Sequence, residues 1–422
     1  MIVVLHPTGN RNVRAVLTGL HDAGLLAEFS TTLAFRSSSV WLDFLPTGLR
    51  KELLRRSYDI PHSLVHTRPW REAVRLFIEQ RLLRGLTTRE TGWTSINAVY
   101  RDLDKHVARR LPGLKGLRGV YAYEYGAYNS FAQAEQSGLK RFYDLPIAYH
   151  QVTQRLIEEE ATRFPQWAVT LTGRLDDAEM IALKDDELRR ADVVFCPSRF
   201  VADSLPAWVR TSKDVFVAPF GSPVNTENVK RIHAGRDRKL RVLFAGSMSQ
   251  RKGLGDLFAA MHRLRQTEIE LVVMGSPLAP MEFYRREYPD FVHEPTRPHA
   301  EVLRLMRSCD VLVLPSLVEG RALVMQEAMS QGLPILITAN TGGEDLVESG
   351  RTGFLVPIRS PEAIAERLAW FAGHREETRA MGEAARAKAA TYTWADYGAT
   401  IVAAIERHLA QPHQSHHGCQ IS

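Results

Sequence analysis

Short apolar runs alternate with helical stretches along the whole chain. Because parallel strands can be joined only through a crossover, usually a helix, this alternation predicts a parallel sheet wrapped by helices, an α/β fold. The helical patterns cover residues 13–24, 150–164, 256–266 and 361–373. The strand-like runs are MIVVLHP, GVYAYE, KRFYDLP, DVVFCPS and DVFVAPF in the first half and RVLFAGS, ELVVMGS, DVLVLPS and LPILIT in the second.

The chain is too long for one ordinary core. It has 422 residues, of which 45% are hydrophobic and 24% charged, so two globular domains are expected. Two segments, RRADVVFCPSRF (189–200) and RSCDVLVLPSLV (307–318), share an aspartate, an apolar strand and a Pro-Ser pair. In this alignment Asp192 corresponds to Asp310 and Ser198 to Ser316. The similarity predicts two related doubly wound halves; the alternative is the chance likeness of any two buried strands.

A polar stretch, GSPVNTENVKRIHAGRDRK, interrupts the pattern at 221–239 and is the best candidate for a linker. The last apolar pattern, near TYTWADYGATIVAAIERHLA, indicates an amphipathic helix, and the polar residues after it are expected to be a frayed end. The expected division is residues 1–222, a linker at 223–239, residues 240–392, a helix at 393–410 and a flexible tail at 411–422.

Cysteine content and hydropathy exclude several classes of protein. The three cysteines, Cys196, Cys309 and Cys419, are odd in number and lack CxxC spacing, which argues against a disulfide framework or a zinc site. The start has no basic segment followed by a long apolar core, and no run approaches the roughly 18 apolar residues that cross a bilayer. The sequence therefore predicts a cytoplasmic protein.

The net charge is +6, and much of the excess lies between Arg50 and Arg89. Arg71, Arg75, Arg81 and Arg84 alternate there with apolar residues, as in a basic amphipathic helix that meets an anionic membrane face or an acidic substrate. The alternative is a solvated helix whose arginine stems cover apolar surface. No nucleic-acid motif accompanies the charge, so no nucleic-acid partner is expected.

One segment carries the clearest chemical signal, PSLVEGRALVMQEAMSQGLPIL at 315–336. A buried strand ends near Pro315, and a helix is expected from about Arg321, with free N–H groups and a positive dipole end that suit a phosphate. Glu319 and Glu327 would then lie about 12 Å apart along the helix axis, too far to act on one atom. They could reach the two ends of an extended ligand such as a nucleotide-sugar, whose diphosphate would lie over the helix start.

The segment resembles the E-x7-E motif of glycosyltransferase family 4. The resemblance extends in the family's order through the second half, in FAGSMSQRKGL (244–254), VVMGSP (272–277), TGGEDLVESGRTGFLVP (341–357) and YTW (392–394). It implies a retaining, metal-independent, hexosyltransferase-like enzyme without a cofactor. The implied fold is GT-B: two Rossmann-like doubly wound domains that face an interdomain cleft, with a C-terminal helix crossing back to the first domain.

The resemblance also assigns roles to residues of the second half. Lys252 with Arg251 would neutralise the donor diphosphate, Glu319 would lie beside the transferred sugar, and Glu327 would bind the ribose. The base would lie after Gly275. The remaining residues expected to bind the donor are Gly246, Ser247, Gly320, Arg321, Ala322, Leu323 and Val324, the last five through the start of the helix.

Two positions depart from the family pattern. Ser247 stands where an arginine is usual, and either Arg251 or Arg321 could supply the missing cation. Arg321 and Ala322 replace the usual Phe-Gly pair, which leaves the choice of donor open.

In the first half, the loop HPTGN follows the first strand at the edge where such sheets bind ligands. Gly9 would let this loop approach the donor, and Asn10, Arg11 and Arg14 would face the cleft. The alternative is an ordinary αβ turn in which Asn10 caps the helix.

Three further residues at strand ends are candidates. Asp144, which ranks first, and His150 compete for the position near the reacting sugar that a histidine often fills in the family, and Glu124 is a second candidate for the cleft. The alternatives are a turn residue for Asp144, a structural histidine at a helix start for His150 and an ordinary solvated loop for Glu124. The adjacent Asp176 and Asp177 suit a helix start without a metal, and no metal is expected.

The predicted reaction is sugar transfer from a nucleotide-sugar, UDP- or GDP-linked, to a hydroxyl of a glycan or lipid-linked acceptor. The expected setting is surface polysaccharide or glycoconjugate assembly, with peripheral contact to the inner membrane face. Three alternatives are another GT-B enzyme such as a nucleotide-sugar epimerase, a degenerate scaffold subunit, and a dinucleotide oxidoreductase. The last needs G-x-G-x-x-G after a strand, and neither HPTGNRN nor FAGSMSQRKG has it.

Overall fold

The computed structural model of the chain describes residues 1–35, 50, 53–79, 95–171, 177–223, 238–264 and 268–410. Most of the predicted linker, the whole predicted tail and part of the basic segment, including Arg81, Arg84 and Arg89, lie outside the described residues. Asp176 and Cys419 lie outside them as well.

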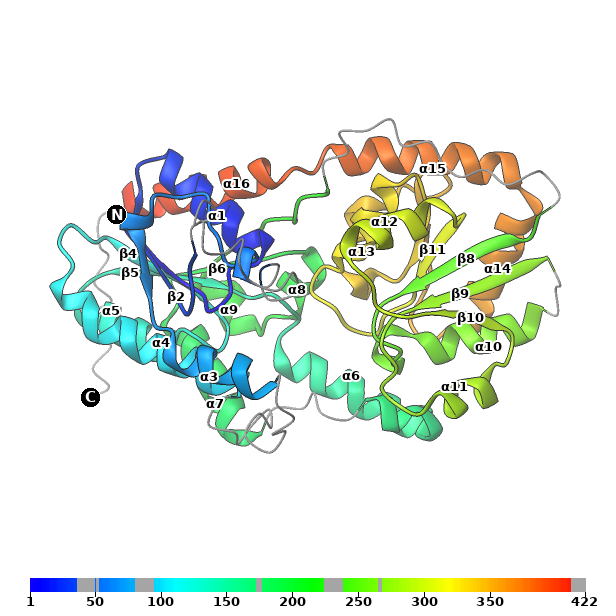
Figure 1. The fold of residues 1–422 in the computed structure, drawn as a ribbon, viewed down its shortest axis with the longest axis horizontal. Helices are drawn as coiled ribbons and strands as arrows, with labels where there is room; N and C mark the ends of the chain where they lie inside the picture. The colour runs from blue at the N-terminus through cyan, green and yellow to red at the C-terminus, as the bar shows by residue number, and fades with distance from the viewer. Residues whose placement is uncertain are drawn as a thin grey trace.

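The described residues form two parallel sheets side by side (Figure 1). The first has the strand order β3-β2-β1-β4-β5-β6-β7 and the second β10-β9-β8-β11-β12-β13. In each sheet the order of the strands therefore reverses once, between β1 and β4 in the first and between β8 and β11 in the second. The first sheet contains β1 (Ile2–Leu5), β2 (Leu26–Thr31), β3 (Val65–Thr67), β4 (Gly119–Tyr123), β5 (Lys140–Asp144), β6 (Val193–Cys196) and β7 (Asp214–Val217). The second contains β8 (Leu240–Ala245), β9 (Ile269–Met274), β10 (Phe291–Glu294), β11 (Val311–Leu314), β12 (Ile335–Ile337) and β13 (Gly353–Leu355).

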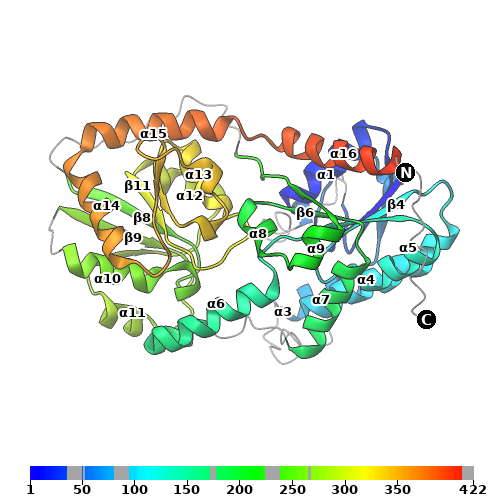
Figure 2. The same cartoon turned by 180° about the vertical axis from the view of Figure 1, so that it is seen from behind.

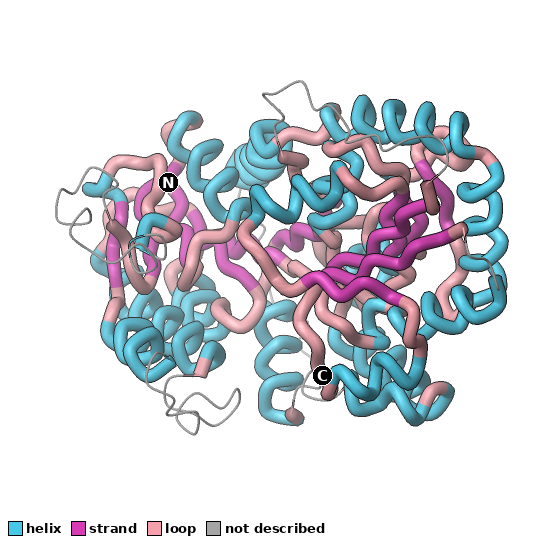
Figure 3. Tube along the Cα trace, turned by 45° about the vertical axis from the view of Figure 1, so that its right-hand side comes forward, coloured by secondary structure: helices cyan, strands magenta, loops and turns pink. Residues whose placement is uncertain are grey.

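Helices enclose the strands of both sheets (Figure 3). The central strands are buried along their length because both of their faces are covered, which explains their nearly continuous apolar sequences. The helices of the first half are α1 (Arg11–Asp22), α3 (Trp70–Glu79), α4 (Ile96–Arg110), α5 (Tyr128–Gln136), α6 (His150–Arg163), α7 (Ala178–Arg190), α8 (Arg199–Ser204) and α9 (Ala207–Ser212). Those of the second half are α10 (Leu254–Leu264), α11 (Met281–Glu287), α12 (His299–Arg307), α13 (Leu323–Ser330), α14 (Pro361–Gly373), α15 (Arg375–Ala390) and α16 (Trp394–Ala410).

The internal similarity predicted from the sequence has a structural counterpart in β6 and β11. Asp192, just before β6, accepts the backbone N–H of Arg141 at 2.8 Å, and Asp310, just before β11, accepts that of Arg241 at 2.9 Å. Each carboxylate also holds an arginine side chain, of Arg141 and of Arg238 respectively. The two halves therefore start these two strands with the same device, although β6 lies third from β1 and β11 lies next to β8.

The C-terminal helix crosses back to the first half, as predicted. Helix α15 lies along the second half and α16 continues along α1 (Figures 1 and 2). Tyr397, Ile401 and Ile405 of α16 join the core that also contains Val13 and Leu17 of α1. The two helices approach closely at a glycine, because a Cβ at Gly398 would lie 2.6 Å from the carbonyl oxygen of Ala15.

A second crossing runs the other way. Helix α6 bridges the two halves on the side opposite α15 and α16 (Figure 2). Just after it, Trp167 is fully buried in the core of the second half, where its ring packs against Phe258, Phe283 and Tyr284. The second core thus includes a residue from the predicted first domain, and the predicted domain limits stay a prediction.

Gly398→Ala tests the close packing of α1 and α16. Alanine favours a helix by about 1 kcal/mol over glycine, but overpacking against backbone costs about 1–3 kcal/mol. We expect the free energy of unfolding, measured by guanidinium denaturation, to fall by about 1 kcal/mol net. Gly373→Ala is the control, because nothing lies within 4 Å of a Cβ there and only the gain in helix propensity acts. A similar gain from both substitutions would contradict the packing.

Candidate functional site

The strand order of the second sheet reverses between β8 and β11. In doubly wound sheets, ligands bind beyond the carboxyl ends of the strands at such a point. The loop after β8 carries Arg251 and Lys252, and the loop after β11 carries Glu319. The topology therefore brings together the three charged residues that the sequence predicts for the reacting end of the donor.

Glu319 forms ion pairs with both cations through one carboxylate oxygen. Its Oε1 lies 2.7 Å from Lys252 Nζ and 2.8 Å from Arg251 Nη1. Burial raises the pKa of the Glu319 carboxyl, but the charges of Lys252 and Arg251 outweigh this effect and hold the pKa below its ordinary value. Glu319 is thus an ionised carboxylate, and Arg251 is additionally anchored by a hydrogen bond from Nη1 to the carbonyl of Val318 at 2.8 Å.

The stem of Lys252 packs directly on the backbone of Gly246 at the end of β8. Gly246 has φ +148°, and a Cβ there would lie 2.7 Å from Lys252 Cδ. Any other residue would push the lysine away from Glu319. Ser247, the next residue, has a buried hydroxyl without a hydrogen-bond partner among the described residues. The predicted donor residues Gly246, Ser247, Arg251 and Lys252 therefore lie in one loop, of which Arg251 and Lys252 contact Glu319.

Helix α13 begins at Leu323, two residues later than predicted. The first N–H groups of a helix have no partner within it, so those of Leu323 and Val324 are the candidates for a phosphate. The N–H of Ala322 instead donates to the carbonyl of Thr341 at 3.2 Å, so the prediction that it cradles the donor is not supported.

Gly320 lies where the two halves touch. A Cβ there would lie 1.7 Å from the carbonyl oxygen of Pro146, and the hydroxyl of Ser198 donates to the Gly320 carbonyl at 2.7 Å. Pro146 and Ser198 follow β5 and β6 of the first sheet. The glycine is needed for this close approach of the first half, a role that the sequence did not predict.

The side chain of Arg321 does not replace the cation missing at Ser247. It is completely buried, and its guanidinium pairs with Asp345 at 2.7 Å and donates to Gln326 at 2.9 Å and to the carbonyl of Gly342 at 3.0 Å. These three partners occupy the guanidinium. Of the two proposed replacements, only Arg251 contacts Glu319.

Glu327 lies on α13 beyond its first turn and pairs with His299, whose Nε2 is 2.9 Å from Glu327 Oε1. His299 is the first residue of α12, and no motif in the sequence singled it out. Near the predicted base position, the carbonyl of Gly275 accepts a hydrogen bond from His293 Nε2 at 3.1 Å. The carboxyl ends of β9 and β10 thus meet next to the region predicted for the base.

In the first half, His6 shapes the loop after β1. Burial lowers the pKa of His6 to about 3, so the ring is neutral and its Nδ1 accepts the N–H groups of Thr8 at 3.1 Å and Gly9 at 3.0 Å. Gly9 has φ +59°, and the ring of Tyr58 covers it, since a Cβ there would lie 2.2 Å from Tyr58 Cε1. The sequence missed His6 because its role depends on hydrogen bonds to the loop itself.

The three polar candidates next to Gly9 differ in position. Asn10 and Arg11 are exposed, and Asn10 takes the capping position of α1 without a side-chain hydrogen bond. Arg14 donates to the carbonyls of Gly9 at 3.1 Å, Arg55 at 2.5 Å and Ser57. The structure thus ties the Arg14 side chain to the segment around Tyr58, and the prediction that Asn10, Arg11 and Arg14 face the cleft stays a prediction.

Asp144, the first-ranked catalytic candidate of the first half, is buried. Its Oδ2 accepts the hydroxyls of Tyr121 at 2.7 Å and Tyr397 at 3.2 Å, and the latter belongs to α16. Burial raises the pKa of Asp144 to about 7, although these two hydrogen bonds act in the opposite direction. These contacts give Asp144 a structural role in fixing α16 and do not support a place beside the reacting sugar.

His150 and Glu124 are also buried. His150 starts α6, and its Nε2 lies 2.7 Å from Asp185, while its Nδ1 has no hydrogen-bond partner among the described residues. Glu124 lies 3.3 Å from Lys184 Nζ. His150 therefore keeps one unused ring nitrogen and stays a candidate, whereas Glu124 belongs to a buried ion pair.

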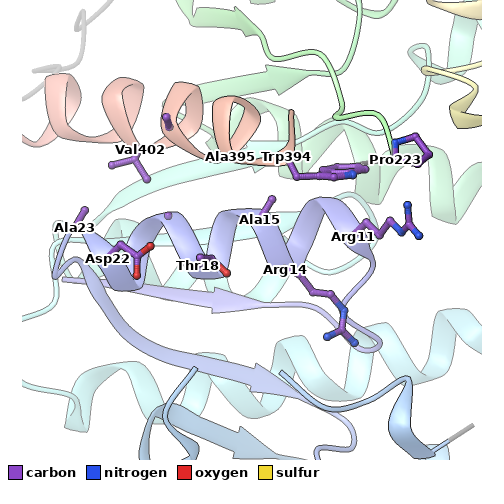
Figure 4. Close-up of a pocket in the computed structure, with 12 residues that line it drawn as sticks. Arg11, Arg14, Ala15, Thr18, Asp22, Ala23, Pro223, Trp394, Ala395 and Val402 are labelled. Carbon is purple, nitrogen blue, oxygen red and sulfur yellow. The ribbon is translucent and has the colours of Figure 1, made fainter. Parts of the chain in front are cut away.

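A groove of about 770 Å³ lies between α1 and α16 (Figure 4). Arg11 and Arg14 lie at one end of it, and Asp22 lies toward the other. Its lining is Arg11, Arg14, Ala15, Thr18, Gly19, Asp22, Ala23, Pro223, Trp394, Ala395, Ala399 and Val402. None of the predicted donor-binding residues is among them, so the groove is separate from the ion-pair cluster.

Within the described part of the chain, no group of three or more His, Cys, Asp or Glu side chains is arranged to hold a metal ion. Cys196 and Cys309 are buried free thiols. No described helix has the length and apolar character to cross a membrane.

Comparison with known proteins shows that the second half is similar to glycosyltransferases. Residues 225–388 match the family described as glycosyl transferases group 1. A D-inositol 3-phosphate glycosyltransferase of Corynebacterium glutamicum is 30% identical over 194 residues, 42% of this chain and 46% of that protein. An MMP alpha-(1->4)-mannosyltransferase of Mycolicibacterium hassiacum is 26% identical over 334 residues, 76% of this chain and 78% of that protein. The chain spans less than half the length of several curated relatives that it matches.

Solved structures resemble the whole chain. A sucrose-phosphate synthase from Thermosynechococcus elongatus has a TM-score of 0.66 at 17% identity and covers 97% of this chain and 99% of its own. Anabaena HepE in complex with UDP and glucose has a TM-score of 0.57 at 15% identity, and the match covers 96% of this chain and 99% of HepE. At such identities the likeness concerns the fold, and it confirms the predicted GT-B architecture.

Asp144→Asn tests the buried contact between β5 and α16. Since the folded pKa of about 7 exceeds the ordinary value, the folded chain holds this proton over a range where the unfolded chain has lost it. The stabilising contribution is complete below about pH 4 and is lost as the pH rises to about 7. The free energy of unfolding of the variant should therefore fall less steeply with pH in this window, by up to about 1.4 kcal/mol per pH unit.

Urea denaturation at several pH values measures this difference. Asp59→Asn, at an exposed aspartate, is the control and should leave the pH dependence unchanged. If Asp144→Asn has the same slope as the parent chain, Asp144 is not protonated in the folded state.

Proposed function

We propose that the chain is a retaining glycosyltransferase that moves a sugar from a nucleotide-sugar to an acceptor hydroxyl. The observation that carries the proposal is the cluster of Lys252, Arg251 and Glu319. It lies where the strand order of the second sheet reverses, next to the start of α13. Further support comes from the family match, which spans all of these residues. The fold is that of HepE, whose structure was solved with UDP and glucose.

The cluster is suited to a diphosphate leaving group. When the bond between sugar and phosphate breaks, negative charge develops on the diphosphate, and fixed positive groups lower the energy of that state without reorganising. Lys252 and Arg251 would supply the charge, with the N–H groups of Leu323 and Val324 at the positive end of α13. Glu319 holds both cations in place before the donor binds.

Glu319 is poorly suited to be a general base. Its two ion pairs keep the carboxylate ionised and lower its affinity for a proton. We infer that it binds hydroxyls of the transferred sugar, while a phosphate oxygen of the donor takes the acceptor proton on the same face from which the diphosphate leaves. The anomeric configuration would then be retained without a metal and without a carboxylate nucleophile of the glycosidase type.

We further propose a setting in surface polysaccharide or glycoconjugate assembly, with a glycan or lipid-linked acceptor at the inner membrane face. The support is the net charge of +6 and the arginine-rich sequence between Arg50 and Arg89. Sedimentation with vesicles tests this part. We expect more binding to vesicles that contain anionic lipid than to neutral ones, and equal binding would remove the support.

A panel of UDP, GDP and ADP is the first test of the enzymatic proposal. A nucleotide that binds the folded state and not the unfolded state should raise the melting temperature of the chain, by an amount that grows with the nucleotide concentration. The nucleotide that stabilises most identifies the donor class, and its sugar conjugates can then be tried with candidate acceptors. If no nucleotide diphosphate stabilises the chain, the proposed function is wrong and a scaffold role is favoured.

Lys252→Ala and Glu319→Gln should separate binding from turnover. Loss of Lys252 removes a diphosphate cation, so nucleotide affinity and turnover should both fall, turnover by about 10²–10³-fold. Loss of the Glu319 charge frees both cations from their counter-ion, so nucleotide affinity should stay equal or rise while turnover falls. Nucleotide release in the presence of acceptor measures turnover, and calorimetric titration measures affinity.

Lys105→Ala and Glu383→Gln are the matched controls, because both side chains are exposed and lie outside the cluster. Near-normal turnover of both Lys252→Ala and Glu319→Gln on the true acceptor would overturn the assignment.

Glu327 should recognise the ribose. A carboxylate that accepts hydrogen bonds from ribose hydroxyls discriminates against a sugar that lacks one of them. We expect the parent chain to bind UDP about tenfold more tightly than 2′-deoxy-UDP, and Glu327→Ala to lose most of that preference. If the donor panel selects another base, the matching pair of nucleotides replaces these. An unchanged preference in Glu327→Ala would contradict the role.

A further inference from the structure

Gln250, the residue before the two cations, is completely buried, and its side-chain amide is fully hydrogen-bonded. Its Nε2 donates to Glu160 Oε1 and to Asp256 Oδ2, both at 2.7 Å, and its Oε1 accepts the N–H of Gly255 at 2.8 Å. Its backbone N–H donates to Thr170 Oγ1 at 3.0 Å. Glu160 and Thr170 come from the first half of the sequence, whereas Asp256 and Gly255 come from the second.

The two carboxylates that hold Gln250 are themselves neutralised. Arg163 reaches both, Glu160 at 2.6 Å and Asp256 at 2.7 Å. Arg359, from the loop before α14, lies 2.8 Å from Glu160. A buried polar network is stabilising only when each member has its partners, and this one links α6, α10 and the loop before α14 through Gln250.

The end of α6 is anchored in the second core by Trp167. A Cβ at Gly255 would lie 2.8 Å from the Trp167 ring, and the indole N–H donates to Glu287 at 3.1 Å. The ring is surrounded by Phe258 and Phe283. The helix that bridges the halves in Figure 2 therefore ends in a fixed position against the loop that carries the cations.

We propose that Gln250 is a positioning residue of the donor site, through which helix α6 of the first half holds Arg251 and Lys252 in place. The two cations converge on one oxygen of Glu319, at 2.8 and 2.7 Å, although like charges repel and both side chains are flexible. Because the backbone is fixed at Gln250, fewer conformations are open to the side chains of Arg251 and Lys252. The proposal rests on the proposed function for the ligand that the cations bind.

The test combines Gln250→Leu with two measurements. Hydrogen exchange of residues 250–255 should become faster, because the N–H groups of Gln250 and Gly255 lose their fixed arrangement. UDP, or the nucleotide selected by the donor panel, should bind about tenfold or more weakly, since displaced cations lose their geometry. Unchanged exchange or unchanged affinity would overturn the proposal.

Asp104→Asn serves as the stability control. Asp104 is as deeply buried and accepts the N–H groups of Asn129 at 2.7 Å and Ser130 at 2.8 Å, but it lies in the first half away from the cation loop. We expect it to lower the melting temperature without changing nucleotide affinity. If both variants weaken nucleotide binding in proportion to lost stability, Gln250 has only a structural role.

Gln250→Glu provides a readout that general destabilisation would not give. It places a third carboxyl between Glu160 and Asp256, with Arg163 and Arg359 as the facing cations, so repulsion should loosen the loop at neutral pH. Protonation of one carboxyl restores a hydrogen bond, and nucleotide affinity should recover as the pH is lowered. No recovery would contradict the proposal. If the parent chain binds no nucleotide, the proposed function fails, and hydrogen exchange in the parent chain, Gln250→Leu and Gln250→Glu alone decides whether Gln250 holds the loop.

Discussion

The arrangement of the candidate site depends on one carboxylate oxygen. Glu319 Oε1 is shared by Lys252 and Arg251, which approach from the loop after β8, while Glu319 itself follows β11. Removing these three charges from water is costly, and a buried ion pair seldom repays that cost in stability alone. An arrangement of two cations and one carboxylate leaves an excess positive charge in a confined place. An anionic ligand would complete it, which is why we interpret the cluster as a binding site and not as a structural one.

The sequence predicts the central strands well and the outer ones poorly. The nine predicted runs correspond to β1, to β4–β9 and to β11 and β12. Except for β7, an edge strand with exposed and half-buried positions, these are central strands, whose burial on both faces gives nearly continuous apolar sequence. The four strands that were missed include the edge strands β3, β10 and β13. β3 and β13 have only three residues each, and only the first residue of β10, Phe291, is buried. An edge strand needs less apolar sequence, so its pattern is weaker.

In the candidate site, features set by neighbouring residues could be predicted from the sequence, whereas contacts between residues distant in sequence could not. The ends of β8 and β11 could be placed from the sequence because strand, loop and helix follow one another locally. The directions of Arg14 and Arg321 could not, because their partners, the carbonyls of residues 55 and 57 and the carboxylate of Asp345, are distant in sequence. The roles of His6 and Asp144 were likewise set by three-dimensional contacts, with a loop backbone and with Tyr397.

Two helices that cross between the halves, and one direct backbone contact, hold the halves together at three separate places. Helix α16 returns to the first core through Tyr397 and Asp144, and α6 reaches the second core through Trp167 and Gln250. Between them, the hydroxyl of Ser198 and the carbonyl of Pro146 meet the backbone of Gly320, the neighbour of Glu319. Under the proposed function, the sugar end of the donor would therefore lie where the first half makes contact with the second. Residues of the first half can then act on the acceptor at the same place, and His150, at the opposite end of α6 from the Gln250 network, is connected to the cation loop through a single helix.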